Sequence, residues 1–240
     1  MTKIYEALQK ADKERGGMEA RAAAMTVSSA TPRALEGKLL AVYQRIDTAI
    51  DEDRGRIVEF AGIQSERDSC KLAGELAKLT TSRLGKSVLL VGAGPVQNIR
   101  DYLRGSTPQG WEKVVLGEAT ISDVVYPVGE SGLAVTQMAL SDATLPTILG
   151  APNIESIFTN LRENFDLVLV DAPPLSASWN AVRLSGLVDG VVLVVEAGKT
   201  RWHVVRHGMD QIAAQRGNVL GVILNRQKHY IPDFIYRRMI

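Results

Sequence analysis

Short apolar runs rich in β-branched residues recur from residue 56 onward and alternate with stretches of helical periodicity. The runs show no alternation of polar and apolar positions, which is typical of strands covered on both faces of a parallel sheet. We predict strands at Ile57 to Ala61, Val88 to Val91, Leu133 to Thr136, Leu167 to Val170, Val191 to Val195 and Val219 to Leu224. We predict the intervening helices at Cys70 to Leu84, Ile154 to Arg162 and Trp202 to Ala214. Repeated βαβ units predict an α/β fold with a three-layer, doubly wound, mostly parallel sheet.

The segment before the first strand has a different character. Ile4 to Arg15 has apolar residues at helical spacing, which predicts a short amphipathic helix. Gly16 to Arg33 is rich in Gly, Ala, Ser and Thr and is predicted to be a flexible linker. A second helix is predicted from Leu35 to Ile50. We therefore divide the chain into an N-terminal helix and linker, residues 1–33, and one α/β domain, residues 34–240.

Composition narrows the class of protein. The chain has 240 residues, 45% of them hydrophobic, which suits one sizeable domain. Its 28 Lys and Arg against 27 Asp and Glu give a net charge of +1, so we expect no bulk attraction to nucleic acid or to an anionic membrane. The single cysteine, Cys70, excludes an internal disulfide and suits a reducing cytosol as a buried or half-buried thiol. The apolar runs are far shorter than a membrane span.

Residues 61–71 follow the first predicted strand, where a nucleotide-binding fold would place its phosphate loop. Such a loop needs glycines, a lysine for the terminal phosphates and a hydroxyl for magnesium. This stretch instead predicts an ordinary helix start, with Ser65 as cap, Asp68 as capping carboxylate and Glu66 between them. Loss of the lysine and of some loop N–H contacts removes on the order of 5 kcal/mol. A micromolar nucleotide site would then become roughly millimolar.

Three other places carry candidate chemistry. Asp171 ends an apolar strand before a diproline turn, where it either holds the water shell of magnesium or only caps the turn. Asn225 ends the last strand, where it either binds an adenine edge or caps the following loop. The triplet Gly85-Lys86-Ser87 resembles part of a phosphate loop but precedes a strand, so we expect it not to bind phosphate.

Other kinds of site are not indicated. His203 and His207 are four residues apart on one predicted helix without a nearby Cys or Glu, which favours a solvated helix face over a metal site. No Ser/His/Asp or Cys/His arrangement stands out. No stripe of aromatic and basic residues indicates nucleic-acid binding.

Several motifs together resemble the bacterial tyrosine autokinases (BY-kinases) of capsule and exopolysaccharide synthesis, over essentially the whole chain. The motifs are Thr2 to Ala11, Gly110 to Gly117, Asp123 to Pro127, Asp171 to Pro174, Asp189 to Val195, and Gly221 to Arg226 with Ile231 to Tyr236. The resemblance implies a cytoplasmic P-loop NTPase-like domain. It also implies a membrane polysaccharide copolymerase, or chain-length determinant, as partner.

The chain departs from this family at its phosphate loop. Family members have a loop of the type GEGKST, and the residues at those positions here are Glu66, Arg67, Asp68, Ser69, Cys70 and Lys71. Ser69 therefore stands in place of the phosphate lysine, and Cys70 in place of the magnesium-binding hydroxyl. By this resemblance the Walker A motif is degenerate.

Three further family features are also altered. Two aspartates of the second family motif are replaced by Gly92 and Gly94. The charged residues of the oligomerisation helix are replaced by Ala41, Gln44 and Asp47, and the C-terminal tyrosine cluster is reduced to Tyr230 and Tyr236. Only Asp171 and Asn225 match the nucleotide-site positions of the family, so any nucleotide site would be vestigial.

These departures favour a non-catalytic pseudokinase, an adaptor of exopolysaccharide synthesis and export. It would lie in the cytoplasm at the inner membrane, bound to the copolymerase, an active homologue or a second copy of itself. Neither a cofactor, a metal nor a nucleic acid is expected. The alternative is an active autokinase or ATPase that uses ATP and magnesium, with Lys71 replacing the missing lysine. A positioning ATPase acting on DNA or a cell pole fits the fold but not the termini.

Overall fold

An eight-stranded sheet forms the centre of the molecule. The computed structural model describes residues 23–27, 32–50, 55–64, 66–94, 99–103 and 107–225. The strands are β1 (Ala23–Val27), β2 (Arg56–Gly62), β3 (Val88–Gly92), β4 (Tyr126–Pro127), β5 (Leu133–Gln137), β6 (Leu167–Ala172), β7 (Gly190–Glu196) and β8 (Val219–Asn225). Their order is β1-β8-β7-β2-β6-β3-β5-β4. Neighbouring strands are parallel except β4 and β5.

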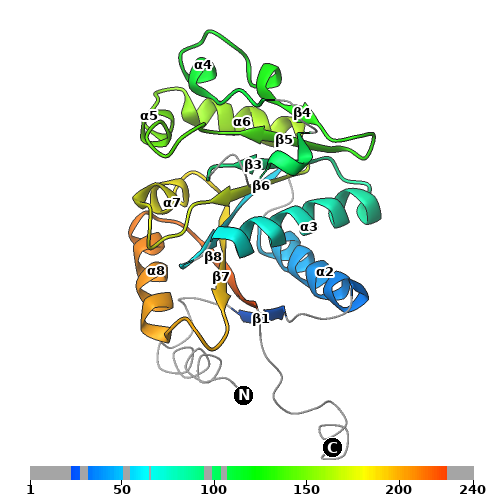
Figure 1. The fold of residues 1–240 in the computed structure, drawn as a ribbon, viewed down its shortest axis with the longest axis vertical. Helices are drawn as coiled ribbons and strands as arrows, with labels where there is room; N and C mark the ends of the chain where they lie inside the picture. The colour runs from blue at the N-terminus through cyan, green and yellow to red at the C-terminus, as the bar shows by residue number, and fades with distance from the viewer. Residues whose placement is uncertain are drawn as a thin grey trace, which may run out of the picture.

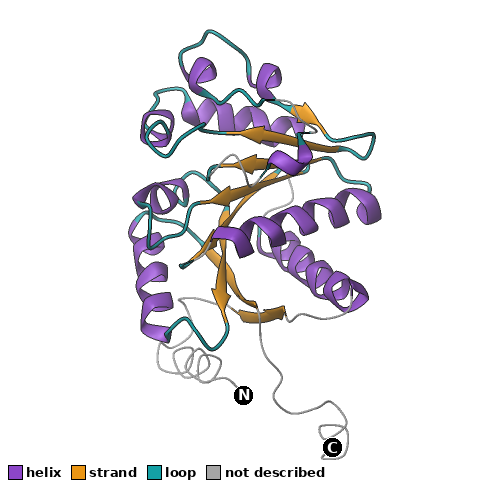
Figure 2. Cartoon of the chain, in the orientation of Figure 1, coloured by secondary structure: helices purple, strands orange, loops and turns teal. Residues whose placement is uncertain are grey.

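Helices cover both faces of this sheet, as Figures 1 and 2 show. They are α2 (Pro32–Ala49), α3 (Glu66–Leu84), α4 (Glu112–Val115), α5 (Leu145–Leu149), α6 (Ile154–Asn164), α7 (Trp179–Leu184) and α8 (Trp202–Ala214), with 3-10 turns η2 (Arg100–Tyr102) and η3 (Ile121–Val124). Leu39 and Leu76 of α2 and α3 belong to one core cluster. Phe158, Val182 and Val205 of α6, α7 and α8 belong to the other, on the opposite face. The predicted three-layer, mostly parallel α/β fold is confirmed.

The six predicted strands and the three intervening helices are all present, with ends within a few residues. The second helix is also confirmed as α2, which begins at Pro32, a residue suited to the first turn because its missing N–H has no helical partner. Helix α3 ends before Gly85, whose φ of +64° suits the left-handed position after a helix.

The prediction that Gly16 to Arg33 is a linker is wrong for residues 23–27. This segment forms β1, which pairs in parallel with β8 from Ala23 opposite Gly221 to Val27 opposite Asn225. Its two alanines give it a weak strand signal, and pairing with the backbone edge of β8 supplies the reason for it to extend. The short elements β4, α4, α5 and α7 were also not predicted. The predicted helix Ile4 to Arg15 lies outside the described residues.

No helix in the described ranges is both long and apolar enough to cross a bilayer.

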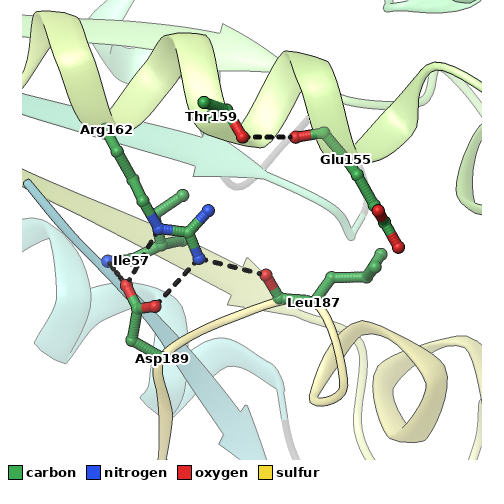
Figure 3. Close-up of polar contacts among 6 residues, drawn as sticks. All are labelled: Ile57, Glu155, Thr159, Arg162, Leu187 and Asp189. Carbon is green, nitrogen blue, oxygen red and sulfur yellow. Dashed lines mark hydrogen bonds and ion pairs between the residues drawn. The ribbon is translucent and has the colours of Figure 1, made fainter.

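At the amino edge of the sheet, an ion pair between Arg162 and Asp189 links a helix to two strands, as Figure 3 shows. Arg162 of α6 donates to both carboxylate oxygens of Asp189, with Nη2 to Oδ1 at 2.9 Å and Nε to Oδ2 at 3.3 Å. The same Arg162 Nη2 lies 3.4 Å from the carbonyl oxygen of Leu187. Asp189 Oδ2 also accepts from the backbone N of Ile57 at 2.7 Å. One carboxylate therefore joins α6, the start of β7 and the start of β2.

We expect Arg162→Lys to destabilise the fold almost as much as Arg162→Ala, by about 1–3 kcal/mol, because an ammonium cannot reproduce the two-nitrogen contact. Urea unfolding of both variants measures this. The control Lys199→Ala breaks an exposed ion pair, Lys199 to Glu196 at 2.9 Å, and should cost less than about 0.5 kcal/mol. Equal stability of the wild type and Arg162→Lys would show that the two-nitrogen contact with Asp189 does not stabilise the fold.

Glu59 is an exception in the apolar pattern of β2. Its side chain is fully buried in the central strand, opposite Val170 of β6 and Val191 of β7. Within the described part of the chain, neither carboxyl oxygen has a hydrogen-bond partner. Burial without a partner raises the pKa of Glu59 well above its ordinary value of 4.5, because the charged form is poorly solvated there. The folded protein therefore favours a neutral carboxylic acid at this position.

Glu59 gives stability a defined pH dependence. Between the pKa of the unfolded chain, near 4.5, and the raised pKa of the folded state, the native protein binds one more proton than the unfolded chain. Stability therefore falls as pH rises through this window, by at most about 1.4 kcal/mol per pH unit. We expect the stability difference between Glu59→Gln and wild type to shift in favour of the variant as pH rises from 5 to 8. Urea unfolding at each pH measures it, and the exposed-site control Glu130→Gln should show no such trend.

Candidate functional site

The candidate site lies at the carboxyl edge of the sheet, between β2 and β6. The chain leaves β2 toward α3 on one face and leaves β6 toward α7 on the other. Adjacent parallel strands whose connections diverge in this way form the crevice in which α/β proteins bind ligands. The two loops are tied together here, since the backbone N of Leu175 donates to the carbonyl of Gly62 at 3.0 Å and that of Ser176 to Ile63 at 3.1 Å.

Asp171 lies at this edge, and its side chain is fully buried. Ser69, in the first turn of α3, is also fully buried, and its Oγ donates to Asp171 Oδ1 at 3.1 Å. The serine at the family's lysine position therefore makes a direct contact with the strand-end aspartate. Since Asp171 bonds to a helix rather than only to its own turn, it does more than cap the diproline segment.

The other residues at the loop positions differ in exposure. Asp68 is only 7% exposed, so its side chain is largely enclosed. Cys70 forms no disulfide and is half-buried, as predicted. Helix α3 begins at Glu66, but Ser65 and the side chain of Glu66 lie outside the described residues, so the capping role of Ser65 stays a prediction.

Gly92 and Gln137 continue the row of strand ends beyond Asp171. Gly92 of β3 is in register with Asp171 of β6 on one side and with Gln137 of β5 on the other. Gln137 is fully buried, and its Nε2 donates to the carbonyl of Gly94 at 2.8 Å. A buried amide therefore lies beside the positions where the family has its second pair of aspartates. The sequence analysis did not identify Gln137; its signal was a polar residue directly after an apolar run.

Asn225 is not brought close to Asp171. It ends β8, and three strand spacings, or about 14 Å, separate β8 from β6. Asn225 is partly exposed, and its carbonyl accepts from the backbone N of Ala197 at 2.9 Å. Both roles considered for its side chain stay untested.

The triplet Gly85-Lys86-Ser87 lies at the opposite, amino edge of the sheet, ahead of β3. Lys86 Nζ is 3.7 Å from Asp166 Oδ1, and both the backbone N and the Oγ of Ser87 donate to Asp166 Oδ2 at 2.8 Å. These hydrogen bonds from Ser87, with a smaller effect of Lys86, lower the pKa of Asp166. The triplet therefore links the start of β3 to the start of β6, and its position before a strand is the one that the sequence predicted.

Metal ligands do not gather elsewhere in the described structure. His203 and His207 are both exposed on α8, which confirms the solvated-face prediction. Among the described residues, no group of three or more His, Cys, Asp or Glu side chains could hold a metal ion.

Comparison of the sequence with known proteins finds bacterial tyrosine-protein kinases and a polysaccharide biosynthesis transport protein. No protein-family model matches the chain. It is 26% identical over 185 residues to the tyrosine-protein kinase YwqD of Bacillus subtilis, covering 71% of this chain and 77% of that protein. It is 25% identical over 189 residues to the succinoglycan biosynthesis transport protein ExoP of Rhizobium meliloti, covering 75% of this chain but 23% of that protein.

Comparison of the structure with solved structures also finds a tyrosine kinase. The kinase domain of the Escherichia coli tyrosine kinase ETK superposes with a TM-score of 0.69 at 18% identity, covering 97% of this chain and 91% of that one. The cell division ATPase MinD of Pyrococcus furiosus superposes less well, with a TM-score of 0.57 at 18% identity over 77% of this chain and 79% of that one. These structures show the fold.

The contact between Ser69 and Asp171 makes a testable prediction. We expect Ser69→Ala to destabilise the protein by about 1–3 kcal/mol, because a fully buried carboxylate loses a donor. The matched control is Ser82→Ala on the exposed part of the same helix, whose Oγ bonds only backbone carbonyls of the preceding turn, with an expected change under about 0.5 kcal/mol. Thermal unfolding of the two variants measures the difference, and equal effects would contradict it.

The relatives found by sequence and the solved structures found by fold thus confirm the resemblance that the motifs indicated: the chain is similar to the bacterial tyrosine kinases associated with exopolysaccharide synthesis.

Proposed function

We propose that this protein is a non-catalytic pseudokinase that serves as an adaptor in exopolysaccharide synthesis and export. The observation that carries the proposal is the buried hydrogen bond from Ser69 to Asp171. In this arrangement the one matching aspartate near the loop is bound to a serine hydroxyl, and no cation stands at the position of the phosphate lysine. Ser69 and Asp171 therefore stabilise the fold by bonding to each other.

The residues at this edge do not fit magnesium and a triphosphate. Asp68 is enclosed, Asp171 accepts a hydrogen bond from Ser69, and Gly92 and Gly94 supply no carboxylate for a metal. Charge-assisted hydrogen bonds contribute roughly 1.5–3 kcal/mol each, so loss of the lysine and of loop N–H contacts removes on the order of 5 kcal/mol. We therefore propose that the protein works without ATP and without a metal.

The rival proposal, an active kinase that uses Lys71, is disfavoured by helix geometry. Lys71 is exposed on α3, whereas Ser69, two residues earlier, is fully buried against Asp171. Two residues turn a helix by about 200°, so the two side chains leave on nearly opposite sides. Lys71 would have to reach back around the helix to meet a phosphate at this crevice.

The adaptor proposal also names a setting. ExoP is described as a biosynthesis transport protein for succinoglycan, and YwqD as a tyrosine-protein kinase. By analogy we propose that this chain binds, in the cytoplasm and at the inner membrane, a polysaccharide copolymerase or an active homologue. Asp47, at one altered position of the oligomerisation helix, pairs with Arg56 of its own chain at 2.9 Å, so it is engaged within the fold.

Titration calorimetry with magnesium ATP tests the absence of a nucleotide site. We expect an affinity near the millimolar range, since a loss of about 5 kcal/mol is between three and four decades of the dissociation constant. Ser69→Ala and Lys71→Ala should leave the titration unchanged. A dissociation constant below roughly a hundred micromolar that is lost in Lys71→Ala would instead support an active kinase that uses Lys71.

The variant Asp171→Asn tests the role in cells. It keeps the shape and the acceptor for Ser69 but removes the carboxylate that a kinase would need for metal. We expect normal polymer production and normal copurification with a membrane copolymerase or an intact autokinase. Loss of polymer with unchanged stability and assembly would contradict the adaptor role.

A further inference from the structure

Three residues at the carboxyl edge lie in one row across neighbouring strands. Asp171 of β6, Gly92 of β3 and Gln137 of β5 are paired in register. All three fall on the α3 face, because each continues the alternation set by buried residues such as Leu169, Leu90 and Val135. The middle position of the row has no side chain.

Gln137 fills this empty middle position. A Cβ atom built on Gly92 would come within 2.5 Å of Gln137 Oε1 and within 3.1 Å of Ile99 Cγ2. Real Cβ atoms do not approach another atom as closely as the first distance. Gln137 and Ile99 are both fully buried, so the amide can yield little room.

The amide of Gln137 is also anchored. Its Nε2 donates to the carbonyl of Gly94, after β3, at 2.8 Å and to the carbonyl of Ala139, after β5, at 2.6 Å. Among the described residues its Oε1 has no hydrogen-bond partner. Turning the amide over would set its oxygen against two carbonyl oxygens, so the two bonds from Nε2 fix the orientation despite the cost of an unpaired oxygen.

We propose that Gln137 is a positioning residue that has taken over the place of the second aspartate motif. Its side chain occupies the volume that any side chain at position 92 needs, and its amide ties the loop after β3 to the loop after β5. An aspartate restored at position 92 would therefore collide with Gln137. That this collision would prevent a metal site rests on the proposed function. The steric coupling between positions 92 and 137 does not depend on it.

A double-mutant cycle tests the steric part. Gly92→Ala, Gln137→Ala and the double variant are compared with wild type by urea unfolding, without nucleotide. We expect Gly92→Ala to be at least about tenfold less costly in the unfolding equilibrium constant when Gln137 is already alanine. Gly190→Ala is the matched control, since its Cβ would meet Leu220 at 2.4 Å. Gly190 lies on β7, four strand spacings or about 19 Å from β5, so its effect should add to that of Gln137→Ala.

Hydrogen exchange tests the anchoring part. Gln137→Met keeps nearly the same volume but cannot donate to the two carbonyls. We expect faster exchange of the amides of Ala93 and Met138, which donate to the carbonyls of Asp171 and Gly92, and unchanged exchange at Leu90 in the middle of β3. A side chain that only fills space would leave all three amides as in the wild type.

The outcomes separate clearly. An additive cycle overturns the steric role of Gln137, and unchanged exchange in Gln137→Met overturns its anchoring role. If Gly92→Ala does not fold by itself, folding of the double variant would demonstrate the coupling. Failure of both variants to fold would count against the coupling. Tight binding of ATP by the wild type would overturn the proposed function and leave these results standing.

Discussion

The structure depends on one constraint: a parallel sheet must be covered on both faces, and its parallel strands must all end at the same edge. Apolar side chains of β2, β3 and β6 are therefore buried on either side, under α2 and α3 or under α6, α7 and α8. Within the strands, the buried charged side chains are Asp171 at the carboxyl edge and Glu59 in the middle of β2. The chemistry of the protein is decided by the few residues at which strands begin and end.

At each edge, the structure describes a pair of polar side chains that bond to each other. Arg162 and Asp189 join elements at the amino edge, and Ser69 and Asp171 do so at the carboxyl edge. Both pairs connect a helix to the sheet. In a protein that binds a nucleotide, the carboxyl edge would keep such groups for the ligand, and their use within the fold is what supports an adaptor role here.

The sequence alone predicted most of the architecture because long apolar runs leave few alternatives. It did not predict β1, whose extension depends on the free backbone edge of β8, nor the short helices, whose few residues carry no period. At the candidate site it identified Ser69 and Asp171 as positions, but not that they touch. Gln137 went unnoticed because its importance comes from what is missing at Gly92, 45 positions earlier in the chain.

What the sequence by itself determined is the class of fold, the order of its main elements and the resemblance to bacterial tyrosine kinases. These follow from local patterns and from motif spacing, which a single chain carries along its length. Only the tertiary structure showed which residues contact one another at the candidate site. Ser69 of α3 bonds to Asp171 of β6, and the amide of Gln137 occupies the space that a side chain at position 92 would need. Such contacts join residues 45 and 102 positions apart, and only packing across strands brings them together.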